Sequence, residues 1–285
     1  MWSRPTTSGG PARANVPRLA WRDRLLALFG RHGWRGFTRL HGWLKPPSAR
    51  REIRFPTRYG SEFYLVPGDS VDRHVIEEGF YESEVLEAVR PLLEPGAVLW
   101  VVGANFGLHA VTAKCLHPAA SVVCFEPSPA IAARLAENAA LNGATVELHA
   151  YALSAENSAL PFFANSSGNP GMSTLRPAQG FSYDERFVVA TLRAADVIER
   201  GIAPPPTAMV LDVEGAEVDV LRGFGRHLAS TSLRVIVLET ANDFLVTHKP
   251  ADLHTLLRHA GFSFRLLERR EHTAHTLSNF AATRS

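Results

Sequence analysis

Hydrophobic and polar positions alternate in blocks along residues 96–285, and the period of each block predicts a structural element. Short apolar, β-branched runs end at Gly, Glu or Asp, which is typical of buried strands, and segments with apolar residues at helical spacing lie between them. This alternation predicts an α/β protein with a parallel, right-handed, doubly wound sheet. We expect strands over 98–102, 121–125, 145–150, 186–191, 207–213, 233–239, 262–267 and 275–281, and helices over 106–116, 129–141, 218–228 and 252–260.

The residues before this domain follow a different pattern. Residues 1–17 are rich in Pro, Gly, Ser and Thr, which predicts a disordered tail. Residues 18–95 form a predicted basic extension. In its first part, 18–44, Arg alternates with Leu, Trp and Phe, which predicts two short amphipathic helices. These helices either pack on the main domain, with their arginines in water, or lie on a membrane surface or partner.

The second part of the extension predicts a hairpin followed by two helices. Two β-type runs, 53–58 and 62–66, are separated by Tyr-Gly-Ser and read as the hairpin. Ser70 and Ser83 are the expected N-caps of the two helices, and Gly79 separates them. The chain therefore divides into a tail, an extension over 18–95 and a ligand-binding domain over 96–285.

The stretch VLWVVGANFG, residues 98–107, is the feature around which the domain is organised. An apolar run turns at Gly103 and is followed by a helical pattern, which predicts a strand, a tight turn and a helix. In a parallel sheet such a turn binds ligands, because glycine lets the backbone approach closely and the helix N-terminus offers free N–H groups.

Glu126 and Asn105 indicate which type of ligand the site binds. Glu126 ends the next predicted strand, where a carboxylate reaches the two hydroxyls of a ribose. The alternative is a surface Glu that caps the following helix. Asn105 stands where a dinucleotide fingerprint needs its second glycine, so its amide would crowd a diphosphate. S-adenosylmethionine (SAM), which has no phosphate, suits this turn better than a nicotinamide dinucleotide.

Three acids at predicted strand ends are the candidate catalytic residues. Asp212 and Glu214 interrupt the apolar run MVLDVE, and Glu239 ends the next strand. Charges there are costly to bury without a partner, and functional acids of such sheets lie at strand ends. Asp212 is the candidate base or positioning group for an acceptor hydroxyl. The three acids could also hold a divalent cation, but we expect solvated or Arg-paired carboxylates rather than a metal site.

Five segments in order resemble the FkbM-type family of SAM-dependent methyltransferases: GANFGLHAV, FEPSP, ENAALN, LDVEGAEVDVLRG and VIVLE. The resemblance extends over residues 80–239, and D-V-E-G-A-E is its most specific motif. It implies a class I methyltransferase (Rossmann-like) fold with a seven-stranded, mostly parallel sheet whose last strand is antiparallel. It also implies O-methylation of a hydroxyl on a sugar or small metabolite.

The resemblance also implies roles for individual residues. The methionine end of SAM would meet Gly103, Asn105 and Gly107. The ribose would meet Glu126, and the adenine would meet Ala152 and Leu153. Asp212 would lie nearest the transferred methyl group. Asn138 and Asn142 match an N-x-x-x-N spacing that indicates either ligand contact or a polar helix face. The implied cofactor-binding residues are Gly103, Ala104, Asn105, Gly107, Glu126, Pro127, Ala152, Leu153 and Asp212.

The chain departs from the family pattern at four positions where the family has a charged group. These positions are Val101, Ala155, Arg193 and Val210. If each lost group held SAM or acceptor at the pocket rim, each loss would cost about 1–3 kcal/mol of binding. The alternative function is therefore a degenerate, non-catalytic module that binds a partner through its basic N-terminal arm.

Charge and cysteine content bear on partners and compartment. Residues 1–60 hold 13 Arg and Lys against two acids, a charge of +11, so the rest carries −9 of the net +2. Residues 18–58 are thus the candidate for a peripheral contact, with no specific nucleic acid expected. Cys115 and Cys124 form no disulfide framework and, with no recognisable signal peptide, predict a cytoplasmic protein. The loop over 164–180, rich in Gly, Ser and Asn, could act as a lid.

Overall fold

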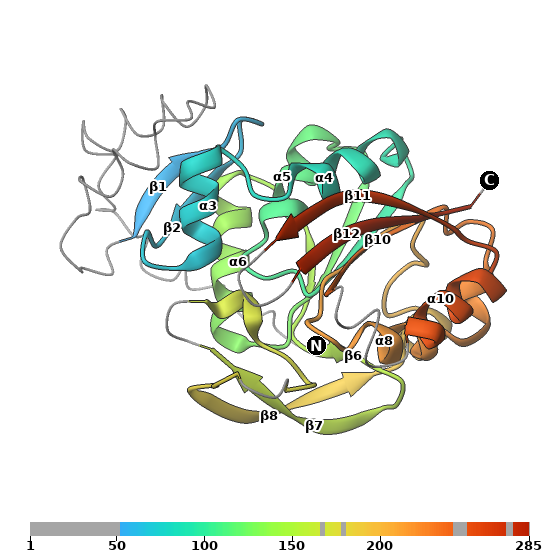
Figure 1. Cartoon of the computed structure of the whole chain (residues 1–285). Helices are drawn as coiled ribbons and strands as arrows, with labels where there is room; N and C mark the ends of the chain where they lie inside the picture. The colour runs from blue at the N-terminus through green and yellow to red at the C-terminus, as the bar shows by residue number, and fades with distance from the viewer. Residues whose placement is uncertain (1–51, 166–168, 178–180, 242–249, 272–275, 285) are drawn as a thin grey trace, which may run out of the picture.

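The computed structural model describes residues 52–165, 169–177, 181–241, 250–271 and 276–284 (Figure 1). The predicted tail and the two predicted amphipathic helices over 18–44 lie outside these residues. Within the described part, no helix combines the length and the apolar character needed to cross a membrane. Both cysteines are free thiols, with Cys124 buried and Cys115 half-buried.

The second part of the extension is confirmed as a hairpin and two helices. Strands β1 (Ile53–Pro56) and β2 (Glu62–Leu65) pair antiparallel. Helix α3 (Ser70–Glu78) ends at Gly79, whose φ of 78° is left-handed, and helix α4 (Ser83–Val89) follows. A 3-10 turn, η1 (Arg90–Leu92), then leads to the main sheet. The predicted N-caps are wrong by one residue, because the two serines are the first helical residues.

The main sheet has seven strands in the order β11-β12-β10-β9-β3-β4-β5. The chain fills the centre first, with β3, then moves outward through β4 and β5, and returns to the other side with β9 and β10. All these neighbours pair in parallel, whereas β12 is antiparallel to both β10 and β11. This confirms the predicted class I methyltransferase sheet. The strands are β3 (Val98–Val102), β4 (Ser121–Phe125), β5 (Glu147–His149), β9 (Ala208–Leu211), β10 (Val235–Ala241), β11 (Ser263–Glu271) and β12 (Thr276–Thr283).

Helices cover both faces of this sheet, and the alternation along β3 shows how. Leu99 and Val101 pack with α3, α4, α5 (Leu108–Leu116) and α6 (Pro129–Leu141). Trp100 and Val102 face the other way and pack with α7 (Ala194–Glu199), α8 (Glu217–Gly223) and α10 (Pro250–His259). Because both faces are buried, the strands are continuously apolar rather than alternating.

A second, three-stranded sheet was only partly predicted. It has the order β6-β8-β7, with β6 (Ala152–Leu153), β7 (Ser158–Ala164) and β8 (Glu185–Leu192), and it lies along the lower edge of the molecule in Figure 1. Only β8 was expected. The strand β7 contains Pro161, which argues against a central strand but is tolerated here because β7 is an edge strand. A 3-10 turn, η2 (Pro170–Met172), lies between β7 and β8.

The two asparagines of the N-x-x-x-N spacing fasten α6 to the hairpin. The Asn138 amide accepts from Tyr64 N–H (2.9 Å) and donates to the Phe106 carbonyl (2.9 Å). The Asn142 amide likewise accepts from Glu62 N–H (2.8 Å) and donates to the Glu62 carbonyl (2.6 Å). Each side chain thus satisfies a backbone group of β2 as a neighbouring strand would. Of the two alternatives for this pair, the structural one agrees with the contacts.

Candidate functional site

The turn after β3 is built from three left-handed residues, Gly103 (φ 77°), Asn105 (φ 48°) and Gly107 (φ 92°). This geometry keeps the chain out of the helical conformation until Leu108, where α5 begins, two residues later than predicted. A Cβ on Gly103 would lie 1.7 Å from the Asp212 carbonyl oxygen. Gly103 is therefore required by the contact between the ends of β3 and β9, in addition to any approach of a ligand.

Asn105 suits its left-handed position because its short amide can bond locally. Its Oδ1 accepts the N–H of Phe106 (2.8 Å), and its own N–H donates to the Glu126 carboxylate (3.0 Å). Its Nδ2 has no hydrogen-bond partner among the described residues, and it lies next to Gly171 in η2. The amide donor therefore remains available at the edge of the turn.

Glu126 ends β4 as a buried carboxylate, 6% exposed. Its two oxygens accept the N–H groups of Asn105 (3.0 Å) and Ser128 (2.9 Å). Burial raises the pKa of Glu126 to about 7, against the lowering effect of these two hydrogen bonds. The side chain is thus fixed at the base of the space between the β3 turn and the start of α6.

A cavity that is partly open to solvent lies over the carboxyl ends of the central strands. Seven of the nine predicted cofactor-binding residues line it: Gly103, Asn105, Glu126, Pro127, Ala152, Leu153 and Asp212. The other two, Ala104 and Gly107, are not in its lining. A Cβ on Gly107 would lie 2.9 Å from Leu135 Cγ, so this glycine makes room for the packing of α6.

Sequence reasoning missed the residues that form the outer wall of the cavity. Part of this wall comes from the three-stranded sheet and the turn beside it, and part from helices α6 and α8. The loop over 164–180 was identified as a candidate lid, but no pattern in it selects individual side chains. The unpredicted lining residues are Val102, Phe125, Ile131, Phe162, Gly171, Ser173, Leu175, Val213 and Ala216.

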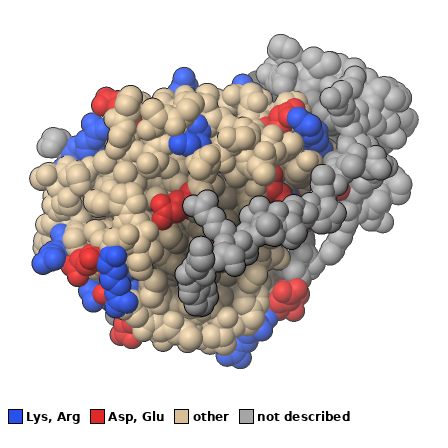
Figure 2. Space-filling view, turned by 180° about the vertical axis from the view of Figure 1, so that it is seen from behind, with Lys and Arg blue, Asp and Glu red and all other residues tan. Residues whose placement is uncertain are grey.

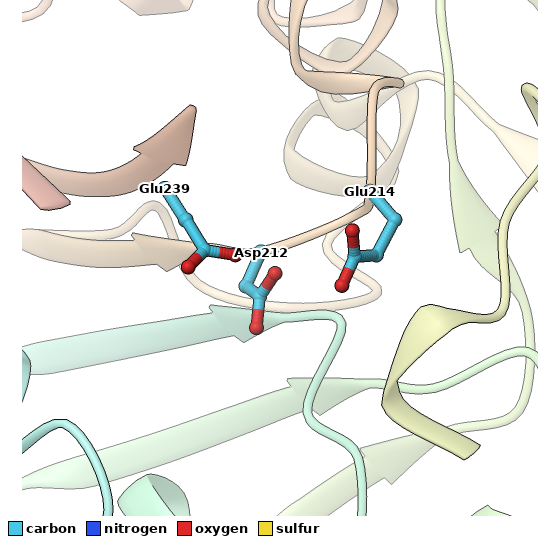
Figure 3. Close-up of side chains that lie close together, drawn as sticks. All are labelled: Asp212, Glu214 and Glu239. Atoms are coloured by element: carbon cyan, nitrogen blue, oxygen red, sulfur yellow. The ribbon is translucent and has the colours of Figure 1, made fainter. Parts of the chain in front are cut away.

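The three predicted acids converge beside this cavity. The carboxylates of Asp212, Glu214 and Glu239 point toward one another from the ends of β9 and β10, and oxygens of all three lie within 4.8 Å of one another (Figure 3). We call these three residues the acid trio. On the face shown in Figure 2, acidic side chains border the hollow near the centre, while most Lys and Arg lie toward the edges.

Burial and the charges of nearby acids raise the pKa values of two members of the trio, Asp212 and Glu214. Burial, followed by the nearby charges of Glu239 and Glu214, raises the pKa of Asp212 well above its usual range. The same causes raise the pKa of Glu214 to about 8, with Glu217 and Glu82 as the repelling charges. Within the described residues, no Lys or Arg pairs with either carboxylate. Oxygens at this spacing could hold one hard cation, and Glu82, at the start of α4, is a further acid that the sequence did not indicate.

The D-V-E-G-A-E motif shapes the turn that carries the trio. Glu214 (φ 52°) and Gly215 (φ 94°) are both left-handed, and the Glu217 carboxylate accepts the N–H of Gly215 (3.0 Å). Glu217 therefore stabilises the turn and the first turn of α8. Further along the motif, a Cβ on Gly223 would lie 2.1 Å from the Ser154 carbonyl, so that glycine permits α8 to contact the end of β6.

The four departures from the family pattern do not lie on the cavity wall, contrary to expectation. None of Val101, Ala155, Arg193 and Val210 is among the lining residues. Val101 and Val210 are register partners on β3 and β9, both buried in the same core. Where the resemblance implies two charged groups, this chain thus has one apolar pair, and no single charge is buried there without a partner.

Comparison with known proteins assigns the chain to a family. Residues 102–264, more than half of the chain, match the model of the Methyltransferase FkbM domain. The chain belongs to this family. This confirms the resemblance in the motifs, and the FkbM domain covers the β3 turn, the acid trio and the three-stranded sheet.

Two curated relatives are methyltransferases by name. The chain is 29% identical over 182 residues to the hexuronic acid methyltransferase AglP of Haloferax volcanii, covering 64% of this chain and 70% of that protein. It is 32% identical over 170 residues to the methyltransferase sdnD of Sordaria araneosa, covering 48% of this chain and 64% of that protein. Among solved structures, a precorrin-6y C5,15-methyltransferase of Geobacter metallireducens aligns with a TM-score of 0.45 and 14% identity, covering 71% of this chain and 87% of that chain.

The close contact at Gly103 gives a prediction with a matched control. Gly96 is also left-handed (φ 86°), but nothing lies within 4 Å of a Cβ placed there. Gly96→Ala should therefore lower the free energy of unfolding by only about 1–2 kcal/mol, the cost of a left-handed alanine. Gly103→Ala should lower the free energy of unfolding by more than about 3 kcal/mol, or prevent folding, because the Asp212 carbonyl oxygen must move. Urea denaturation measures both, and equal losses would contradict the contact.

The raised carboxyl pKa values predict that stability falls as pH rises. The folded protein keeps protons on Glu126 and Glu214 at pH values where the unfolded chain, with ordinary pKa values near 4.5, has released them. The free energy of unfolding should therefore be highest near pH 5 and decrease toward pH 8. Glu214→Gln should make this decrease smaller, whereas Gln at the exposed Glu94 should leave it unchanged. Denaturant unfolding at pH 5.5 and 8.0 checks this, and a decrease of the same size in Glu214→Gln would be contrary evidence.

Proposed function

We propose that this FkbM-family protein is a SAM-dependent O-methyltransferase that acts on a hydroxyl of a sugar or small metabolite. The observation that carries the proposal is a single cavity at the carboxyl ends of the central strands. Glu126 lines one part of this cavity, and Asp212 of the acid trio lines another. A nucleoside and a reacting centre can be held there together.

The cofactor side of the cavity suits the parts of SAM. Glu126 is fixed by two backbone N–H groups and can still accept hydrogen bonds from ribose hydroxyls, since each carboxylate oxygen has a second lone pair. Apolar side chains for an adenine ring come from Ile131, Leu153 and Leu175. The available Asn105 amide could donate to the carboxylate of the methionine end, and the acids favour a sulfonium cation nearby.

The acceptor side suits deprotonation of a hydroxyl. In the proposed reaction the acceptor oxygen attacks the methyl carbon, the carbon–sulfur bond breaks, and the sulfonium becomes a neutral thioether. The hydroxyl proton passes to Asp212, whose raised pKa makes it a stronger base than an ordinary carboxylate once it is ionised. The sulfonium charge favours that ionised form before the transfer. The hexuronic acid named for AglP supports a carbohydrate acceptor.

Removal of the ribose-binding carboxylate tests the cofactor. Wild-type protein should bind SAM with micromolar affinity in calorimetry. Glu126→Ala should weaken binding by about 100-fold or more, because the hydrogen bonds that two ribose hydroxyls donate to the charged carboxylate are lost. Glu94→Ala, on the exposed turn before β3, is the control and should bind like wild type. Absence of binding of both SAM and S-adenosylhomocysteine to wild-type protein would overturn the proposal.

Methyl transfer tests the base. With radiolabelled SAM and a panel of neutral, acidic and amino sugar glycosides, Asp212→Asn should lower kcat by about 100-fold or more, in the range typical of a lost general base. Its affinity for SAM should change much less than kcat does. Glu94→Gln, on the exposed turn before β3, serves as the control. Unchanged kcat in Asp212→Asn would exclude this residue as the base.

A further inference from the structure

Thr174 links the cover of the cavity to the turn that carries the acid trio. It is 2% exposed and lies between Ser173 and Leu175, which both line the cavity. Its backbone exchanges two hydrogen bonds of 2.9 Å with Phe163 on β7, so the loop is fixed to the three-stranded sheet at this point. The residue is 40 positions away from Glu214 in sequence but in contact with it.

The direction of the contact is determined by the hydroxyl itself. Thr174 Oγ1 accepts the backbone N–H of Arg176 (2.9 Å) and lies 2.7 Å from the backbone carbonyl oxygen of Glu214. A carbonyl cannot donate, and a hydroxyl has a single proton. The Thr174 proton is therefore donated to the Glu214 carbonyl.

Glu214 needs such support because its backbone is unfavourable. Its φ of 52° is left-handed, a conformation that is unfavourable for a residue other than glycine. This conformation directs the Glu214 side chain toward Asp212 and Glu239 (Figure 3). A partly buried hydrogen bond to its carbonyl offsets part of this cost.

We propose that Thr174 is a positioning residue, which holds Glu214 in the left-handed conformation and so completes the acid trio. The role of the trio in methyl transfer rests on the proposed function, but the assembly of the trio does not. The sequence gives no signal for this residue, since a threonine in a polar loop is unremarkable.

A neighbouring contact provides a matched control. The Arg176 side chain pairs with Asp219 on α8 (2.6 Å) and also fastens the loop, but it is 63% exposed and does not touch Glu214. Ion pairs of side chains this exposed contribute little to stability. Arg176→Ala therefore loosens the loop without removing the bond to the Glu214 carbonyl, because the Arg176 backbone N–H is retained.

The test follows the titration of Glu214 by carbon-13 NMR of the full chain labelled at glutamate carboxyls, with the resonance assigned through Glu214→Gln. It needs neither SAM nor an acceptor, so it can succeed or fail independently of the proposed function. Thr174→Val removes the hydroxyl at nearly equal volume, and its Glu214 should titrate about one pH unit or more below wild type, as the carboxyl leaves its repelling neighbours. Thr174→Ser and Arg176→Ala should titrate like wild type.

Two outcomes would overturn the inference. One is a wild-type titration of Glu214 in Thr174→Val, and the other is an equal change in Arg176→Ala, which would assign the effect to the loop as a whole. If Thr174→Val does not fold, Thr174→Cys retains a weak donor of similar size and should show a smaller change in the same direction. A crystal structure of Thr174→Cys would show whether the hydrogen bond to the Glu214 carbonyl is lost. If it is lost and the titration of Glu214 does not change, this result also counts against the proposal.

Discussion

The ends of β3 and β9 touch because residue 103 has no side chain. Gly103 and the Asp212 carbonyl approach so closely that any Cβ would overlap the oxygen. This contact sets the distance between the turn that faces Glu126 and the turn that carries Asp212 and Glu214. The cavity, the fixed Glu126 carboxylate and the acid trio all take their relative positions from it.

The electrostatics of the site work against the stability of the fold. Buried carboxyls with raised pKa values, such as Glu126 and Glu214, destabilise the folded protein at the pH where they would be ionised. A protein retains groups of this kind where they serve a ligand, and a cationic ligand lowers their cost. In contrast to the acids at the cavity, Val101 and Val210 form an apolar pair within the hydrophobic core below it. Charge is thus concentrated at the cavity and removed from the sheet beneath it.

The three-stranded sheet gives the site its outer wall. It supplies Phe162 and supports the turn with Ser173 and Leu175, so that residues from two sheets surround one space. Its contacts to the main domain include the bond of Thr174 to the Glu214 carbonyl, the ion pair of Arg176 with Asp219, and the approach of β6 to Gly223. Leu153 of β6 is also buried in the core beneath the main sheet.

The sequence by itself determined the central strands, their parallel order, the glycine turn, Glu126 and the three acids. These features depend on short-range periodicity and on the rule that strands joined by helices run parallel, so they can be read locally. Only the tertiary structure decided the strand β7, the outer wall with Thr174, and the structural roles of Asn138, Asn142 and Gly107. These depend on contacts between residues far apart in the chain, such as Thr174 with Glu214 and Asn142 with Glu62. A single sequence carries no periodic signal for such contacts, because either partner alone is an ordinary polar residue.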